Sequence, residues 1–196
     1  MLNLTDLRDL TSLQAVLFLV LYLQCSSRLS TCYAYIGILT RSAARMGLHR
    51  SLSTKFDPIE QQIRKRVFWT IIKMDIYIGA LLGLPMGIDH DEMDQDLAFE
   101  VDDEYITSEK VSQQPPEKMS LMCACNAHTR LVLILKKIMR NVYPITKGLE
   151  SANHGDKGYM VSFAKVREIE KDLECWRETL PEPLRPGSEA PPDTVR

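Results

Sequence analysis

The feature that most constrains the fold is a long, largely apolar segment over residues 58–82, bounded by residues that start and stop helices. Asp57 is a favourable N-cap and Pro58 a favourable first helical residue, whereas Gly83 and Pro85 end a helix. At roughly 1.5 Å per residue, the predicted helix is about 37 Å long. Its second half is apolar on most sides, so this helix must be central, with other elements packed around it.

Helical periodicity also dominates the rest of the chain, and no segment alternates apolar and polar residues as a half-buried strand would. The predicted helices cover about 12–26, 31–46, 58–82, 117–141 and 159–179. Their predicted caps are Thr11 or Ser12 for the first helix, Ser30 or Thr31 for the second, and Gly47 after the second. The predicted fold class is therefore all-α, an irregular bundle of about five helices that forms part of a larger helical domain.

The segments between these helices differ in composition. Residues 86–116 are acidic and lack a helical pattern, which predicts an irregular connection across the surface, and residues 147–158 read as a mobile loop. The last predicted helix carries an apolar stripe: Met160, Phe163, Val166, Ile169, Leu173 and Trp176. We expect a helical domain over 1–180, incomplete as it stands, followed by a proline-rich linker or disordered tail over 181–196.

Composition excludes several classes of function. The formal net charge is −2, which provides no overall attraction to nucleic acid or to an anionic membrane. The five cysteines are irregularly spaced and no secretory signal precedes them, which indicates reduced thiols. The apolar run over 13–25 is shorter than the roughly 20 residues that cross a bilayer, so we interpret it as a buried core helix without membrane contact.

Two clusters of possible metal ligands occur in the sequence, and neither has the spacing of a known kind of metal site. Cys123 and Cys125, with His128 nearby, lie two apart on a predicted helix and so point in different directions, which favours small core residues over zinc ligands. In the acidic run over 89–96, Met93 and Asp94 occupy positions where a calcium loop needs an oxygen ligand and a glycine. We interpret that run as a solvated acidic loop able to repel nucleic acid or to meet a basic partner.

No nucleophile elbow, glycine-rich phosphate loop or HExxH motif is present, and the four histidines lie in unlike contexts. We therefore predict no catalytic residue, no metal ligand and no enzyme. Arg64, Lys65 and Arg66 could form a nuclear-import or nucleic-acid patch. The simpler interpretation is a solvated helix start, with Gln61, Arg64 and Lys65 facing water, and no DNA-binding residue in this chain.

Asp75 is a lone carboxylate on the apolar central helix. A buried carboxylate without a partner costs several kcal/mol, so it needs cations or backbone donors. Arg41 and Arg45 stand one turn apart on the second predicted helix and could present two guanidinium groups. We hypothesise that an Asp75–arginine ion pair fixes how the two helices cross. The alternative is that Asp75 lies at a solvated edge of the helix.

The order of these segments resembles a known family. Gly47-Leu48-His49-Arg50 follows an alanine-containing helix, and a basic cluster with Arg66 precedes Trp69, Asp75 and a Gly83-Leu84-Pro85 turn. Together these residues resemble the middle homology region, or fungal-specific transcription factor domain, of fungal zinc-binuclear-cluster transcription factors. The motif residues are Gly47, His49, Arg50, Arg66, Trp69, Asp75, Gly83 and Pro85.

The chain departs from the family pattern at two positions. Gln62 stands where the family often has Glu, and Leu84 stands where it often has Arg, so an ion pair built from those two charges is in doubt here. The segments VDDEYIT and NAHTRLVLILKKIMRNVYP are similar to regulators of the cutinase-activator type.

The resemblance implies a regulatory domain of a nuclear transcription factor that acts with RNA polymerase II. DNA and zinc would be bound by an N-terminal cluster of six cysteines that is missing from this chain, so no cofactor is expected here. A co-regulator protein or a small effector would act on the domain, and a homodimer is compatible with the family. The rival hypothesis is a helical ligand-binding or scaffold module unrelated to DNA. A cavity lined by Tyr22, Phe68 and Met74 would favour effector binding.

Overall fold

The computed structural model describes residues 7–51, 56–116, 118–143 and 162–187. Within these ranges the α-helices are α1 (Leu10–Cys25), α2 (Leu29–Arg45), α3 (Pro58–Leu82), α4 (Leu121–Val142) and α5 (Phe163–Glu178). Short 3₁₀ turns are η1 (His90–Glu92), η2 (Asp103–Tyr105) and η5 (Glu182–Leu184). Extended pairing in the described ranges is limited to one isolated bridge between Ile106 and Val111. The predicted all-α class is confirmed.

The central helix α3 begins and ends at the predicted residues. The Asp57 side chain accepts the N–H of Glu60, Pro58 occupies the first helical position, and Gly83 closes the helix in the left-handed conformation with φ 67°. These residues fix the two ends of α3 because they suit or satisfy the backbone groups that a helix end leaves unpaired.

The predicted caps of α1 and α2 are wrong. Asp9 caps α1 by accepting the N–H of Ser12 at 2.8 Å, so the helix starts earlier than the Thr11 or Ser12 cap would allow. A carboxylate here also suits the positive end of the helix dipole. The second helix follows a tight turn at Ser27, with φ 58°, and begins after Arg28 without a side-chain cap.

Gly47 ends α2 in a Schellman motif. Its φ is 72°, its N–H donates to the Ala44 carbonyl, and the Leu48 N–H donates to the Ala43 carbonyl. This pair of bonds requires a left-handed residue after the helix, which glycine adopts without steric cost. Beyond this turn, the His49 carbonyl accepts the N–H of Asp94 and the Arg50 guanidinium pairs with the Asp94 carboxylate.

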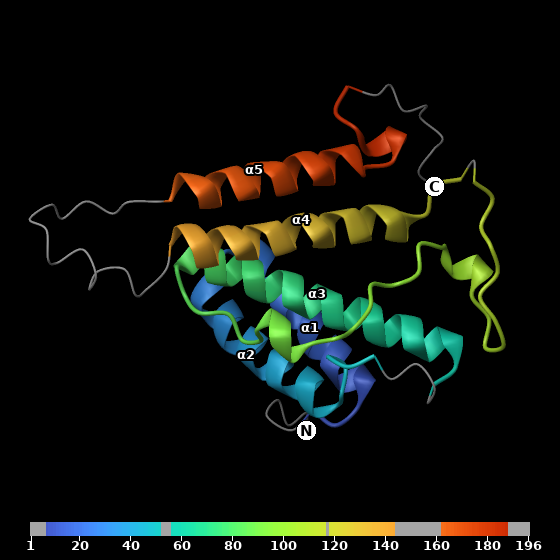
Figure 1. The fold of residues 1–196 in the computed structure, drawn as a ribbon. Helices are drawn as coiled ribbons and strands as arrows, with labels where there is room; N and C mark the ends of the chain where they lie inside the picture. The colour runs from blue at the N-terminus through green and yellow to red at the C-terminus, as the bar shows by residue number, and fades with distance from the viewer. Residues whose placement is uncertain (1–6, 52–55, 117, 144–161, 188–196) are drawn as a thin grey trace, which may run out of the picture.

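The core surrounds α3, which packs against α2 and α4 and touches α1 (Figure 1). Its fully buried members include Leu13, Val20, Ile36, Leu39, Phe68 and Ile71. The apolar run over 13–25 therefore supplies the core on one side, while Phe18 and Tyr22 on its outer side are exposed. Within the described ranges, no helix combines the length and apolar character needed to cross a bilayer.

The last helix, α5, lies on the outside of the bundle against α4 (Figure 1). Its predicted apolar stripe is only partly covered, because α4 is its main neighbour: Ile169 is buried, Leu173 is exposed, and Phe163 is 85% exposed. The Trp176 indole N–H donates to the Ala127 carbonyl at 2.8 Å. Met160, the predicted loop over 147–158 and residues 188–196 of the predicted tail lie outside the described residues, whereas η5 orders the start of that tail.

The side chains whose common cavity would have favoured effector binding are not grouped in the described core. Phe68 and Met74 are buried, but Tyr22 is 65% exposed on the outside of α1. The three side chains therefore do not line a common space, because α1 turns Tyr22 away from α3.

Candidate functional site

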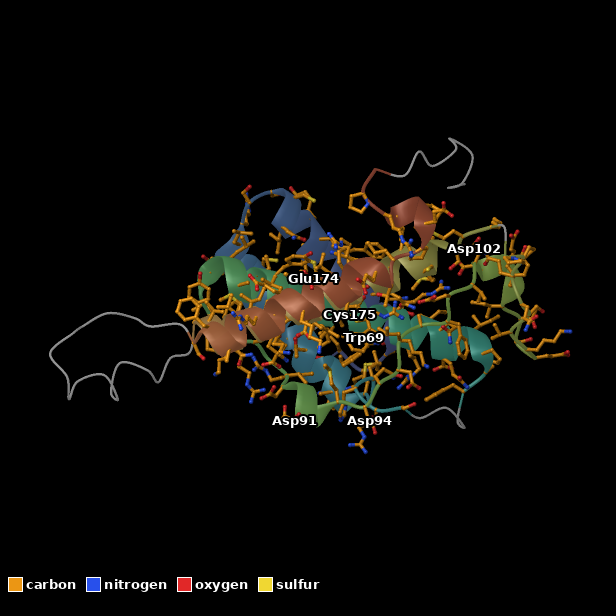
Figure 2. The ribbon with its side chains drawn as sticks, turned by 45° about the horizontal axis from the view of Figure 1, so that its top comes forward. Trp69, Asp91, Asp94, Asp102, Glu174 and Cys175 are labelled. Carbon is orange, nitrogen blue, oxygen red and sulfur yellow. The ribbon has the colours of Figure 1, made fainter. Side chains whose placement is uncertain are left out.

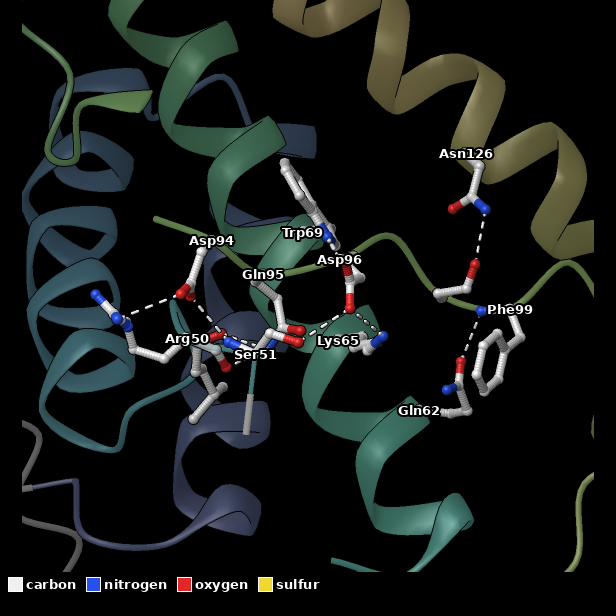
Figure 3. A network of polar contacts seen from close by, with 12 residues as sticks. Arg50, Ser51, Gln62, Lys65, Trp69, Asp94, Gln95, Asp96, Phe99 and Asn126 are labelled. Atoms are coloured by element: carbon white, nitrogen blue, oxygen red, sulfur yellow. Dashed lines mark hydrogen bonds and ion pairs between the residues drawn. The ribbon is translucent and has the colours of Figure 1, made fainter. Parts of the chain in front are cut away.

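The acidic connection predicted after α3 is an ordered strap, defined here as residues 89–104. It runs back along α3 from the C-terminal end of that helix toward its N-terminal half (Figure 1). Figure 2 shows Asp91 and Asp94 at one end of the strap and Asp102 at the other. A polar network fastens the strap to α3, to α4 and to the residues that follow α2 (Figure 3).

The residues that follow α2 supply mainly backbone partners to the strap. The Gln95 amide donates to the carbonyls of Leu48 and Arg50, both at 2.9 Å. The Asp94 carboxylate accepts the N–H of Ser51 at 2.9 Å and lies 3.3 Å from the Arg50 guanidinium. The predicted Gly-Leu-His-Arg motif therefore turns the chain so that its own backbone can receive the strap.

The helix α3 supplies side-chain partners from its buried face. The Trp69 indole N–H donates to the Asp96 carbonyl at 2.9 Å, and the Gln62 side-chain oxygen accepts the N–H of Phe99 at 2.8 Å. From α4, the Asn126 amide donates to the Ala98 carbonyl at 2.8 Å. Buried polar groups need such partners, so these three bonds account for polar residues in otherwise apolar positions.

The basic cluster at the start of α3 does not form a free cationic patch. Arg64 donates to the Met46 carbonyl at 2.8 Å, and Arg66 pairs with Asp103 of the strap. Lys65 was predicted to face water but is buried, with its ammonium 3.4 Å from the Asp96 carboxylate and over the Phe99 ring. The prediction failed because the strap, which comes more than twenty residues later in the sequence, covers this face of α3.

Asp75 binds backbone instead of arginine. Its side chain is almost fully buried, and its carboxylate accepts the N–H of Gly87 at 2.7 Å. Among the described residues no ion pair involves Asp75, so the predicted pair with Arg41 or Arg45 does not form. Both arginines lie on the exposed side of α2, and Arg45 reaches the Leu7 carbonyl at 2.6 Å. Burial raises the pKa of the Asp75 carboxyl, and the Gly87 hydrogen bond and nearby Lys136 oppose that rise.

Asp75 thereby anchors the connector, defined here as residues 83–88, which joins α3 to the strap. A Cβ at Gly87 would lie 3.0 Å from the Thr40 methyl carbon, so the connector also packs closely on α2. The Tyr33 hydroxyl donates to the Pro85 carbonyl at 2.9 Å. The Gly83-Leu84-Pro85 turn therefore begins a segment that is fixed to two helices.

A tyrosine and a histidine side chain are in contact between α3 and α4. The Tyr77 hydroxyl lies 2.7 Å from His128 Nε2, and the two rings stack. Burial and the nearby Lys73 lower the pKa of His128, and burial also lowers the pKa of Lys73. Among the described residues, His, Cys, Asp and Glu side chains form no group of three that could hold a metal ion.

Sequence reasoning missed most of this network. Gln95, Asp96 and Asn126 gave no signal, since a polar residue in a loop or on a half-buried helix is ordinary. The one available clue was Trp69, because a buried indole needs an acceptor for its N–H.

Comparisons with known proteins place the chain more closely. The family model of the fungal specific transcription factor domain matches residues 4–178. Activator of stress genes protein 1 of Candida albicans is 44% identical over 196 residues, covering 95% of this chain and 20% of that protein. Activator of stress genes 1 of Saccharomyces cerevisiae is 44% identical over 194 residues, covering 96% of this chain and 19% of that protein.

A third relative, transcriptional activator protein acu-15 of Neurospora crassa, is 26% identical over 175 residues, covering 89% of this chain and 18% of that protein. The chain thus spans about a fifth of the length of these relatives. No solved structure matches the chain with significance.

The class of protein is therefore a regulatory domain of a fungal transcription factor. The chain belongs to the fungal specific transcription factor domain family. Two of the relatives named above are named as activators of stress genes and the third as a transcriptional activator, and the comparisons give no support to a module unrelated to DNA. The narrower placement among cutinase-activator-type regulators stays a prediction.

Proposed function

We propose that this domain controls the activity of a nuclear transcription factor whose contact with DNA is made outside these residues. The match to the family over 4–178 is the observation that carries the proposal. The charge distribution at the start of α3 supports it, because Arg64, Lys65 and Arg66 are engaged by the domain's own carbonyl and carboxylate groups. The acidic strap that covers this part of α3 repels the phosphate backbone.

Zinc would then be held by a separate cysteine cluster, and this chain would carry no cofactor. Its cysteines lie apart on α1, α2, α4 and α5, and Cys32 is buried against the Val20 carbonyl. The domain would perform no chemistry of its own. Its role would be to restrain or release the activation function of the complete protein.

DNA-binding measurements test the first part of this proposal. Fluorescence anisotropy would compare the isolated chain with the full-length protein on a DNA fragment that the full-length protein binds. We expect sequence-specific binding by the full-length protein and none by the chain. Specific binding by the chain alone, with comparable affinity, would contradict the proposal.

A reporter assay tests the second part. The full-length protein would be compared with a version that lacks residues 4–178, with promoter occupancy measured in both. We expect changed reporter output at equal occupancy, because the domain acts on activation and not on DNA contact. Unchanged output at equal occupancy would show that the domain has no regulatory role.

A further inference from the structure

A groove of about 460 Å³ lies between the connector and the C-terminal part of α4. Its apolar walls include Leu84 and Met86 from the connector, Met139 from α4 and Tyr143, which follows α4. Lys136 and Arg140 contribute the two cations of the groove. A volume of roughly 300–1,000 Å³ is typical of small-molecule sites, as is an apolar lining with a few fixed polar groups.

The two cations of the groove lie near the Asp89 carboxylate, and Asp75 and Glu92 also act on Lys136, whose pKa burial lowers and these three carboxylates raise. Asp89 lies 3.4 Å from the Arg140 guanidinium and 4.0 Å from the Lys136 ammonium, and its own side chain is 50% exposed. The Lys136 side chain is only 14% exposed, and its ammonium donates to the Ile88 carbonyl at 2.7 Å. An ammonium has three donors, so a second acceptor beside Lys136 would offset the cost of its burial.

The cations and apolar walls are arranged so that one molecule can contact both. Lys136 and Arg140 are four residues apart on α4, so their side chains leave the same face of the helix. A second hollow of about 420 Å³ borders the same two cations and Asp89, with Leu133 and Ile134 in its lining. The cationic pair therefore has apolar surface on both sides.

We propose that this groove binds a small amphipathic carboxylate. The carboxylate of the ligand would lie between Lys136 and Arg140, and its apolar body would cover Met86, Met139 and Tyr143. Methionine and tyrosine suit such a body because one adapts its shape and the other offers a flat apolar face. A polyanion or an acidic peptide fits less well, since the groove has two cations and already contains the carboxylate of Asp89.

The ligand would also act on the connector, which forms one wall of the groove. The connector is fixed to α3 by the Asp75–Gly87 hydrogen bond and leads directly into the strap. Occupation of the groove would thus stabilise the connector and the start of the strap. That the ligand is a regulatory effector rests on the proposed function, whereas its binding to the groove does not.

Isothermal titration calorimetry of the chain with 4-phenylbutyrate tests the site, with 4-phenyl-1-butanol as the uncharged match. We expect saturable binding of the carboxylate and at least tenfold weaker binding of the alcohol. Arg140→Leu and Lys136→Met should each weaken the carboxylate about tenfold or more, whereas Arg130→Leu, on α4 outside the groove, should not. Asp89→Asn should strengthen binding severalfold, because it removes the competing carboxylate.

The proposal fails if no saturable binding occurs, if the alcohol binds as tightly as the carboxylate, or if Arg140→Leu leaves the affinity unchanged. Arg140 is largely exposed, so its replacement tests the charge even if Lys136→Met alters folding, which far-ultraviolet circular dichroism would report. No DNA is present in this assay. Its failure is therefore distinguishable from failure of the proposed function.

Discussion

Replacing Gln62 with glutamate probes the least satisfied part of the polar network. Gln62 is 2% exposed, and its side-chain oxygen accepts the Phe99 N–H, which fixes the orientation of the amide. Within the described residues, Gln62 Nε2 and the Nε and Nη2 atoms of Arg66 are buried without a hydrogen-bond partner. Residues four apart are neighbours on a helix surface, so these unsatisfied donors belong to one part of α3.

The Gln62→Glu substitution replaces the unpaired Nε2 donor of Gln62 with an acceptor oxygen, and the other carboxylate oxygen can still accept the Phe99 N–H. A hydrogen bond to a charged group contributes about 1.5–3 kcal/mol, and burial of the carboxylate opposes this gain. Because the Arg66 guanidinium lies one turn away, we expect a net gain of about 1 kcal/mol in the free energy of unfolding. For a chain of this size that corresponds to a rise in Tm of roughly 2–4 °C.

Urea and thermal unfolding at pH 7 would measure the change, with two matched variants. Gln62→Met removes both the acceptor and the donor, so it should destabilise the chain by about 1–3 kcal/mol through the unpaired Phe99 N–H. Arg66→Gln should abolish the gain from Gln62→Glu in a double-mutant cycle. Destabilisation by Gln62→Glu, or a gain that persists in the Arg66→Gln background, would refute the reasoning.

Two further substitutions test the anchors of the connector and of α2. Burial raises the pKa of Asp75 in the native state above the unfolded value of 3.8, so the native state holds this proton more tightly. The contribution of Asp75 to the free energy of unfolding is therefore greatest at low pH. It is lost as the pH rises from the unfolded pKa through the native pKa. Asp75→Asn should therefore stabilise the chain more at pH 7 than at pH 4, relative to the unmodified chain, and a series of urea titrations with no such trend would contradict the assignment. Gly47→Ala should destabilise by about 1 kcal/mol, because φ is 72° in the Schellman motif, and an unchanged Tm would show that the turn tolerates a side chain.

The sequence predicted the elements well where the signal was local. The bounds of α3 follow from Asp57, Pro58 and Gly83, and each of these residues acts within a few positions of itself along the chain. The other helices were predicted to within a few residues, although Asp9 displaced the expected cap of α1.

The polar contacts were not predictable because each joins residues far apart in sequence. Nothing near Lys65 indicates that Asp96 and Phe99 will cover it, and nothing near Asp75 indicates that the Gly87 N–H will be its partner. The rule that a buried carboxylate needs a partner was correct for Asp75, but it could not choose between a cation and a backbone donor. The position of Arg41 in the sequence of α2 allowed a contact with Asp75. Only the packing of the helices shows that Arg41 lies on the exposed side of α2.

The motif residues of this domain fasten the acidic strap to the helical bundle. Hydrogen exchange of the backbone N–H groups of Asp94 and Phe99 tests this attachment directly, since they donate to the His49 carbonyl and the Gln62 side chain. We predict slow exchange of both in the unmodified chain and faster exchange in Trp69→Phe, which removes the indole bond to the strap and keeps an aromatic ring in place. Exchange as fast as in an unstructured peptide, or no response to Trp69→Phe, would show that these contacts do not hold the strap on the bundle.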